Sequence, residues 1–231
     1  MDSMQIVQRI FVPIIYVSYL TIILLIGRYL RHNSPGNRYY KVFGNLAYSL
    51  GLADAIYLIP RLYAILTTGI EDNLKVVGFG RLGYSIFITF FFMILYDAYN
   101  IRFNKKYNKG LNLTIYILGF IRIVICLLPG NDWFELTTST PYAIARLIPL
   151  SLIGLLLMLV TYLHGKRFND RNYKLMPIGI FFSILFLEPM ALVPDNPNRI
   201  FIFTILRTLS LLWIITIGYK ELRDKNVLSR Y

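Results

Sequence analysis

Six ionisable side chains fall inside long apolar stretches of this chain: Asp54, Arg61, Arg122, Arg146, Glu188 and Arg207. A charged side chain at the centre of a membrane costs about 2.5–3.5 kcal/mol on insertion scales, so such groups normally face a bundle interior and carry function. The planar guanidinium group suits two-point binding of a carboxylate or a phosphate. These residue types therefore predict an intramembrane site for an anionic group.

The spacing within one stretch brings three of the candidate side chains together. Asp54 and Arg61 are seven residues apart, which is two helical turns, and Tyr57 lies between them on the same face. Pro60 directly precedes Arg61. A proline inside a helix removes a hydrogen bond and kinks the helix. We therefore expect a kink and a freed backbone carbonyl beside this group.

The charged groups share a depth and carry an excess of positive charge. At a rise of about 1.5 Å per residue, all of them fall at mid-membrane or in the outer half, with Arg81 near the outer surface, and the inner half is almost purely apolar. Four arginines oppose two acids, and unpaired buried charge is heavily penalised, so an anion is the expected missing partner. We expect a cavity open to the outside that is lined by Asp54, Tyr57, Arg61, Arg122, Arg146, Glu188 and Arg207.

Two other interpretations fit the same residues. In the structural one, Arg61 and Arg146 extend to the outer headgroups, and the remaining charges form Arg122–Glu188 and Arg207–Asp54 pairs between helices. In the other, the charged groups line a proton or ion pathway.

The elements that position these residues are apolar runs of about 18–22 residues, long enough to cross about 30 Å of hydrocarbon as helices. The chain has 231 residues, is 56% hydrophobic, and confines its charge to short segments between the runs. We predict an all-α protein, a single domain over residues 1–231. Its seven transmembrane helices are predicted at residues 8–28, 42–65, 77–96, 111–129, 142–163, 175–193 and 200–219.

The basic residues predict the orientation of this bundle. Alternate segments each carry four of them: Arg28, Arg31, Arg38 and Lys41; Arg102, Lys105, Lys106 and Lys109; Lys166, Arg167, Arg171 and Lys174; and Lys220, Arg223, Lys225 and Arg230. The opposite connections are acidic or nearly neutral, with Glu71, Asp72, Asp132, Glu135 and Asp195. Cytoplasmic loops are enriched in Lys and Arg. The N-terminus is therefore predicted outside and the C-terminus in the cytoplasm, which requires an odd number of helices.

Cysteine and histidine usage excludes several kinds of site. Cys126 is the only cysteine, so an intramolecular disulfide is impossible. The two histidines, His32 and His164, fall in or beside cytoplasmic segments, which excludes a histidine metal site within the membrane and a Ser-His-Asp apparatus outside. We expect no metal and no cofactor. The net charge of +12 is explained by topology, and the chain has no nucleic-acid-binding motif.

The last stretch separates this chain from the microbial rhodopsins, which share its length and helix number. Residues 200–213 contain Arg207 and no lysine, and no span has a lysine in its middle, so covalent retinal is excluded.

Three short segments carry resemblances. Residues 51–61, which read Gly-Leu-Ala-Asp-Ala-Ile-Tyr-Leu-Ile-Pro-Arg, resemble the lysoplasmalogenase-like family of small membrane hydrolases, with Ala53-Asp54 where that family has Gly-Asp. The resemblance implies an acid/base or water-orienting role for Asp54. Residues 121–129 and 211–219 are similar to uncharacterised prokaryotic seven-helix membrane proteins, which implies the topology and a prokaryotic plasma (inner) membrane but no activity.

Three functions follow as hypotheses. The leading one is non-catalytic: the outer cavity binds or senses an anionic amphiphile, a lipid headgroup or a small anion through Arg61, Arg122, Arg146 and Arg207, oriented by Asp54 and Glu188. The second is a membrane lipid hydrolase that uses Asp54. The third is a small transporter or proton-coupled carrier that uses Asp54 and Arg207. The lipid bilayer is the one partner that the sequence indicates directly.

Overall fold

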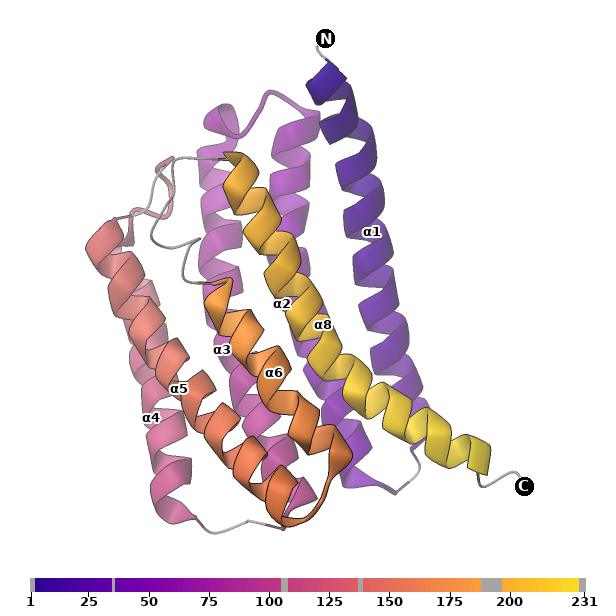
Figure 1. Cartoon of the computed structure of the whole chain (residues 1–231). Coiled ribbons are helices and arrows are strands. Elements are labelled where there is room, and N and C mark those ends of the chain that lie inside the picture. Colours follow the sequence, from indigo (N-terminus) through magenta and orange to yellow (C-terminus); the bar gives the residue numbers. More distant parts are fainter. Residues whose placement is uncertain (1–2, 35, 105–107, 137–138, 188–196, 229–231) are drawn as a thin grey trace.

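The chain folds into a bundle of long helices (Figure 1). The computed structural model describes residues 3–34, 36–104, 108–136, 139–187 and 197–228, which form seven α-helices and contain no strand. The helices are α1 (Ser3–His32), α2 (Arg38–Leu66), α3 (Leu74–Arg102), α4 (Lys109–Leu127), α5 (Thr140–Arg167), α6 (Arg171–Leu185) and α8 (Pro197–Leu228). Two single 3-10 turns, η1 (Glu71–Asn73) and η2 (Pro129–Asn131), lie at the same end of the bundle. The predicted all-α architecture is confirmed.

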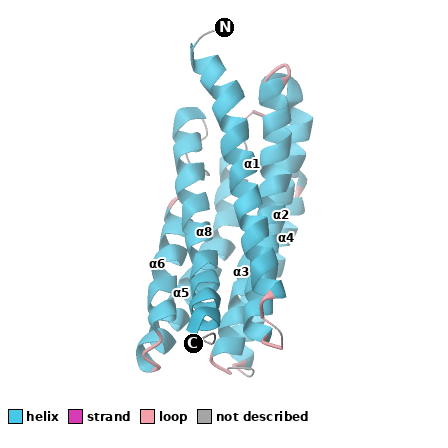
Figure 2. Cartoon of the chain, turned by 90° about the vertical axis from the view of Figure 1, so that its right-hand side faces the viewer, coloured by secondary structure: helices cyan, strands magenta, loops and turns pink. Residues whose placement is uncertain are grey.

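The helices form a ring in which each contacts the next along the chain, and α8 closes the ring against α1 and α2. The two described ends of the chain lie at opposite ends of the bundle (Figures 1 and 2). The end that holds the start of α1, η1 and η2 is called the outer end here, and the opposite end the inner end.

Six of the helices are long and apolar enough to cross a membrane, judged by length and composition. The exception is α6, whose 15 residues span only about 22 Å at the usual rise. Its α-helical geometry ends at Leu185, well before the predicted end at residue 193. The sequence explains an early end, because Pro189 removes a helix hydrogen bond and disfavours helical geometry in the preceding residue. Residues 188–196 lie outside the described part.

All seven described helices begin earlier than their apolar runs predict, and in three of them a capping side chain explains the start. The side chains of Asn37, Asn108 and Asp170 each accept a hydrogen bond from a backbone N–H in the first turn of α2, α4 and α6. Such caps satisfy donors that the helix cannot satisfy itself. Because the caps lie in polar segments, the apolar runs alone placed these starts two to four residues too late.

Large apolar side chains cover the outside of the bundle, as a bilayer requires. Phe120, Phe79 and Leu113 are more than three-fifths exposed, at 67%, 64% and 62%. A soluble domain rarely exposes contiguous apolar surface of this kind. The exterior and the six long helices together identify a helical membrane protein.

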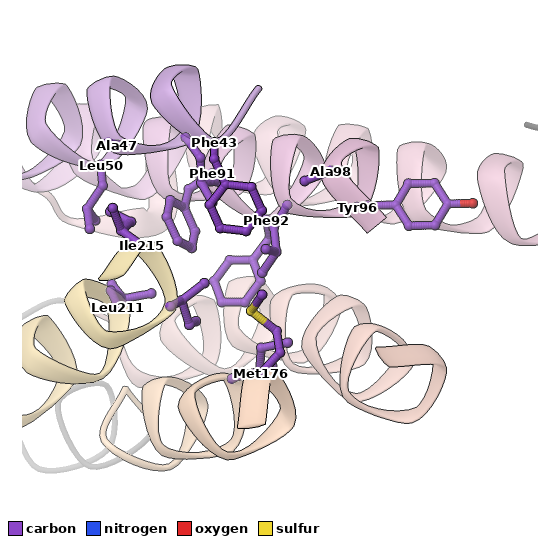
Figure 3. Packing of buried hydrophobic residues seen from close by; sticks show 14 of the residues in the cluster. Phe43, Ala47, Leu50, Phe91, Phe92, Tyr96, Ala98, Met176, Leu211 and Ile215 are labelled. Atoms are coloured by element: carbon purple, nitrogen blue, oxygen red, sulfur yellow. The ribbon is translucent and has the colours of Figure 1, made fainter. Parts of the chain in front are cut away.

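A layer of large apolar side chains fills the middle of the bundle (Figure 3). Phe43 and Leu50 of α2, Phe91 of α3, and Leu211 and Ile215 of α8 are all buried in it. Polar side chains lie on both sides of this layer in α2, α3 and α8. Each of these helices therefore has a polar outer part, an apolar middle and a polar inner part.

The inner end also holds a polar cluster, which lies at the helix ends, beyond the predicted apolar spans. Arg102 of α3 bonds Asp170 at 2.9 Å and also bonds Glu221 of α8. Glu221 further accepts hydrogen bonds from Tyr40 of α2 at 3.1 Å and from Asn172 of α6 at 2.8 Å. The cluster therefore joins α2, α3, α6 and α8.

Candidate functional site

A close approach between α2 and α3 builds the outer polar region. Gly80 lies directly on α2, where an added Cβ would come within 2.8 Å of the Ile56 carbonyl oxygen and 3.2 Å of the Pro60 ring. Ile56 is four residues before Pro60, so its carbonyl is the one that the proline leaves without a helical N–H donor. The freed carbonyl that the sequence predicted thus faces a glycine, and this contact brings the polar residues of α2 and α3 together.

Tyr57 lies beside the arginines of the outer polar region. Arg61, one turn along α2, donates from Nη1 to the Tyr57 hydroxyl at 3.4 Å. Arg81 of α3 and Arg207 of α8 also lie within electrostatic range of this phenol. Tyr57, Arg61 and Arg81 are each partly exposed, so this group forms the accessible part of the region.

A buried ion pair lies behind the accessible group. Nη2 of Arg207 is 3.9 Å from Oδ1 of Asp54, and the two side chains are only 3% and 2% exposed. Asp54 also accepts a hydrogen bond from the Tyr19 hydroxyl of α1. The Arg207–Asp54 pair that the structural interpretation predicted is therefore present, and Asp54 is enclosed by two partners.

Tyr84 links the two parts of the region. Its ring lies 4.4 Å from the Arg207 guanidinium carbon and 5.5 Å from the centre of the Tyr57 ring. The Tyr84 hydroxyl is buried and has no hydrogen-bond partner among the described residues. A buried hydroxyl without a partner normally finds a water molecule or a ligand. The hydrogen-bonding capacity of this hydroxyl is therefore not used by the described residues.

Arg122 and Arg146 were expected to line the same cavity, but their contacts lie elsewhere. Arg122 is 3% exposed and donates to the backbone oxygens of Arg146, at 3.0 Å, and of Ser85, and to the Thr89 hydroxyl. Arg146 donates to Oδ1 of Asn131 at 2.7 Å and covers the Trp133 ring at 4.2 Å. These contacts tie α3, α4 and α5 together. The prediction of four converging arginines is thus replaced by a group of Arg61, Arg81 and Arg207.

The remaining predicted residue, Glu188, lies outside the described residues, and so does the Arg122–Glu188 pair. Neither Arg61 nor Arg81 has a carboxylate oxygen within 4.0 Å among the residues that the structure describes. In the described part of the region, Asp54 is the one acid that pairs with an arginine, against three guanidinium groups.

The outer end also has two surface pockets. One, of about 420 Å³, is lined by residues of α1, the end of α2 and η1, including Arg9, Glu71 and Asp72. The other, of about 260 Å³, lies between Leu82 of α3 and the segment that follows α4. The arginine group lines neither pocket. Within the described ranges, no three His, Cys, Asp or Glu side chains lie close enough to hold a metal ion.

Sequence reasoning missed several residues of both polar regions. Tyr19 looked like one of many tyrosines, and Arg81 was noted for its depth but not counted as a candidate. Arg102 was assigned to a basic loop because the apolar run ends at residue 96, whereas α3 continues to Arg102. The acids of the α8 tail and of the loop before α6 were the available signal, since buried arginines require acceptors.

Comparisons of the chain with protein-family models, with curated proteins and with solved structures return no match.

Proposed function

We propose that this protein crosses the membrane seven times with its N-terminus outside, and binds an anionic amphiphile in its outer half. In this proposal α6 counts as a crossing in addition to the six long helices. The alternation of basic and acidic connections and the opposite positions of the two described chain ends support this topology.

The observation that carries the binding proposal is the partly exposed Arg61 on the Tyr57 hydroxyl, with Arg207 over the Tyr84 ring that packs against Tyr57. Three helices supply the cations, and Arg61 and Arg81 have no carboxylate partner among the described residues. Guanidinium groups bind carboxylate and phosphate through two parallel hydrogen bonds. An anionic headgroup placed against Arg61 and Arg81 satisfies both cations and lies near the buried Arg207.

The surroundings of Arg61 favour a ligand that is partly apolar. Ile65 follows Arg61 by one turn on the same face of α2 and is partly exposed. An acyl chain that lies along this surface contacts apolar side chains while its headgroup reaches Arg61. A small anion gains no such contact.

The two alternative functions find less support. A hydrolase that uses Asp54 needs this carboxylate beside water and substrate, but Asp54 is 1% exposed and bonded by Tyr19 and Arg207. A carrier needs a polar path to the inner end, and the apolar layer of Phe43, Leu50 and Phe91 lies between the two polar regions.

The test is native mass spectrometry of the full-length protein in a mild detergent, titrated with dihexanoyl-phosphatidylglycerol. Dihexanoyl-phosphatidylcholine serves as the probe without net charge. The variants are Arg61→Gln and, as a control with the same loss of charge at the same end, Lys75→Gln, whose side chain is exposed at the start of α3.

We expect wild type to prefer the anionic probe and Arg61→Gln to weaken its binding about 10- to 100-fold, because a hydrogen bond to a charged group is worth about 1.5–3 kcal/mol. Lys75→Gln should bind as wild type does. Equal loss in both variants would show general surface attraction, and unchanged binding by Arg61→Gln would refute the site.

A further inference from the structure

The inner parts of α1 and α2 pack closely against each other as a helical hairpin (Figure 1). An added Cβ at Gly44 of α2 would come within 2.5 Å of Cγ of Arg31 and 3.1 Å of the Gly27 carbonyl oxygen. One turn toward the outer end, an added Cβ at Gly27 would lie 3.3 Å from the Tyr48 ring. The two backbones therefore approach closely, and the stem of Arg31 lies directly on α2.

This packing places the Arg31 guanidinium over an aromatic ring at the surface. Its Cζ lies 5.8 Å from the centre of the Tyr48 ring, which is within the range of a cation–π interaction. Arg31 is exposed, and within the described ranges its side chain makes no hydrogen bond and no ion pair. All five N–H donors of this guanidinium are therefore available to a partner outside the bundle.

Two more cations lie on the same side of this hairpin. Arg28 precedes Arg31 by about one helical turn, and Lys41 precedes Tyr48 by two turns, so each shares a face with the residue it precedes. Both are exposed, and neither has a carboxylate oxygen within 4.0 Å among the residues that the structure describes. Residues 3–53 contain no acid at all. Three cations therefore share this side of the hairpin without a carboxylate partner in the described structure.

Toward the outer end the same side of the hairpin becomes apolar. Leu24 precedes Arg28 by one turn on α1, and Leu52 follows Tyr48 by one turn on α2. The two leucines are exposed by 47% and 48%. Leu24 also lies at the contact between the helices, because an added Cβ at Gly51 would be 3.5 Å from its Cδ2. The hairpin thus presents cations at its inner end, then an aromatic ring, then apolar side chains, which is the order of phosphate, glycerol esters and acyl chains in a phospholipid.

We propose that this side of the hairpin binds one anionic phospholipid from the leaflet at the inner end, with the phosphate on Arg31 and an acyl chain along Leu24 and Leu52. A guanidinium binds phosphate through two parallel hydrogen bonds. Because Tyr48 and the backbone of α2 already hold Arg31, binding costs it less conformational entropy than it costs a free side chain. The cations without an acid favour a lipid with a net negative charge over a zwitterionic one. This site lies at the opposite end of the bundle from Arg61, so it does not rest on the function proposed above.

Three variants test the site, each made in the wild-type chain and again in Arg61→Gln, where the outer site does not contribute. Arg31→Gln removes the cation. Arg31→Lys keeps the charge but loses the planar two-point contact, and it carries the test if Arg31→Gln does not fold. Arg223→Gln is the matched control, since Arg223 is an exposed arginine of α8 at the same end of the bundle.

The experiment titrates the full-length proteins in a mild detergent with dioleoyl-phosphatidylglycerol, and native mass spectrometry counts the bound lipids. Dioleoyl-phosphatidylcholine is the probe without net charge. We expect the anionic lipid to be preferred, and Arg31→Gln to weaken its binding about 10- to 100-fold, because hydrogen bonds to a charged group are lost. Arg31→Lys should weaken binding about 3- to 10-fold, since a single hydrogen bond replaces two. Arg223→Gln should bind as its parent does.

The outcomes separate a built site from general attraction by the basic segments. Weaker binding by both Arg31 variants, with unchanged binding by Arg223→Gln, supports the site. Equal losses in Arg31→Gln and Arg223→Gln would show attraction by surface charge alone, and full binding by Arg31→Lys would show that any cation suffices; either result overturns the site. Equal affinity for the two lipids, or no binding, overturns it as well. Because the ratios are also measured in Arg61→Gln, they keep their meaning if the outer binding site is refuted.

Discussion

The Arg207–Asp54 pair gives a stability prediction whose size follows from the structure. The two groups lie 3.9 Å apart and are almost fully buried. Two unit charges about 4 Å apart attract each other by about 4 kcal/mol at an effective dielectric constant near 20. Removing one member of a buried pair costs about 3–5 kcal/mol, because the other charge stays buried. Arg207→Leu should therefore lower the free energy of unfolding by about 3–5 kcal/mol.

A double-mutant cycle separates the pair from other effects of the substitutions. Combining Asp54→Asn with Arg207→Leu removes both charges, so the double variant should regain about 2 kcal/mol relative to the sum of the single losses. Arg223→Leu is the control, because Arg223 lies on the same helix in an exposed pair with Asp224. Exposed pairs contribute about 0–1 kcal/mol.

The single cysteine provides the assay. Cys126 is fully buried, so a thiol-reactive fluorophore reports unfolding as the thiol becomes accessible on heating. On the scale known for soluble domains of this size, a loss of 3–5 kcal/mol lowers Tm by about 6–20 °C. Single losses that add within about 0.5 kcal/mol in the double variant would refute the pair as a coupled unit.

Two further predictions concern the inner end and the topology. Arg102→Leu leaves Asp170 and Glu221 without their shared cation. This variant should lower the free energy of unfolding by about 1–3 kcal/mol in the same assay, since these groups are partly exposed to water. Arg102→Lys should restore part of the loss, and equal losses in the two variants would contradict the bridging role. In a Cys126→Ser background, an impermeant maleimide should label Lys75→Cys in intact cells and Lys41→Cys only after the cells are permeabilised. The reverse pattern would overturn the orientation.

Much of the fold could be predicted because an apolar run forms a helix in lipid without help from other parts of the chain. A segment of about 20 apolar residues must be helical in lipid, whatever surrounds it. The relation of Asp54, Tyr57 and Arg61 likewise depends only on helical spacing, and so does the carbonyl that Pro60 frees. These local features are present in the structure.

The partners of the buried charges could not be predicted, because they depend on how each helix is rotated. Asp54 meets Arg207 and Tyr19, which are 153 and 35 residues away in the chain. Arg102 and Glu221 are 119 residues apart and meet at the inner end. No local sequence pattern indicates which residues so far apart in the chain will pair. The charges of the inner end were assigned to loops because the helices continue beyond their apolar runs.

Counting charges misjudged Arg122 for a different reason. Its acceptors are two backbone carbonyl oxygens and a threonine hydroxyl. Every residue has a backbone carbonyl oxygen, whatever its side chain, so the sequence does not show which residues will accept from an arginine. An excess of arginine over acid is therefore weak evidence for a missing anion in a helical bundle. What distinguishes Arg61 is its set of contacts: its partners are phenols, Tyr57 at 3.4 Å and Tyr16 of α1, and it lies on a partly exposed face. A guanidinium has five N–H donors, so Arg61 keeps donors for a ligand on an accessible face, whereas Arg122 is 3% exposed and out of reach.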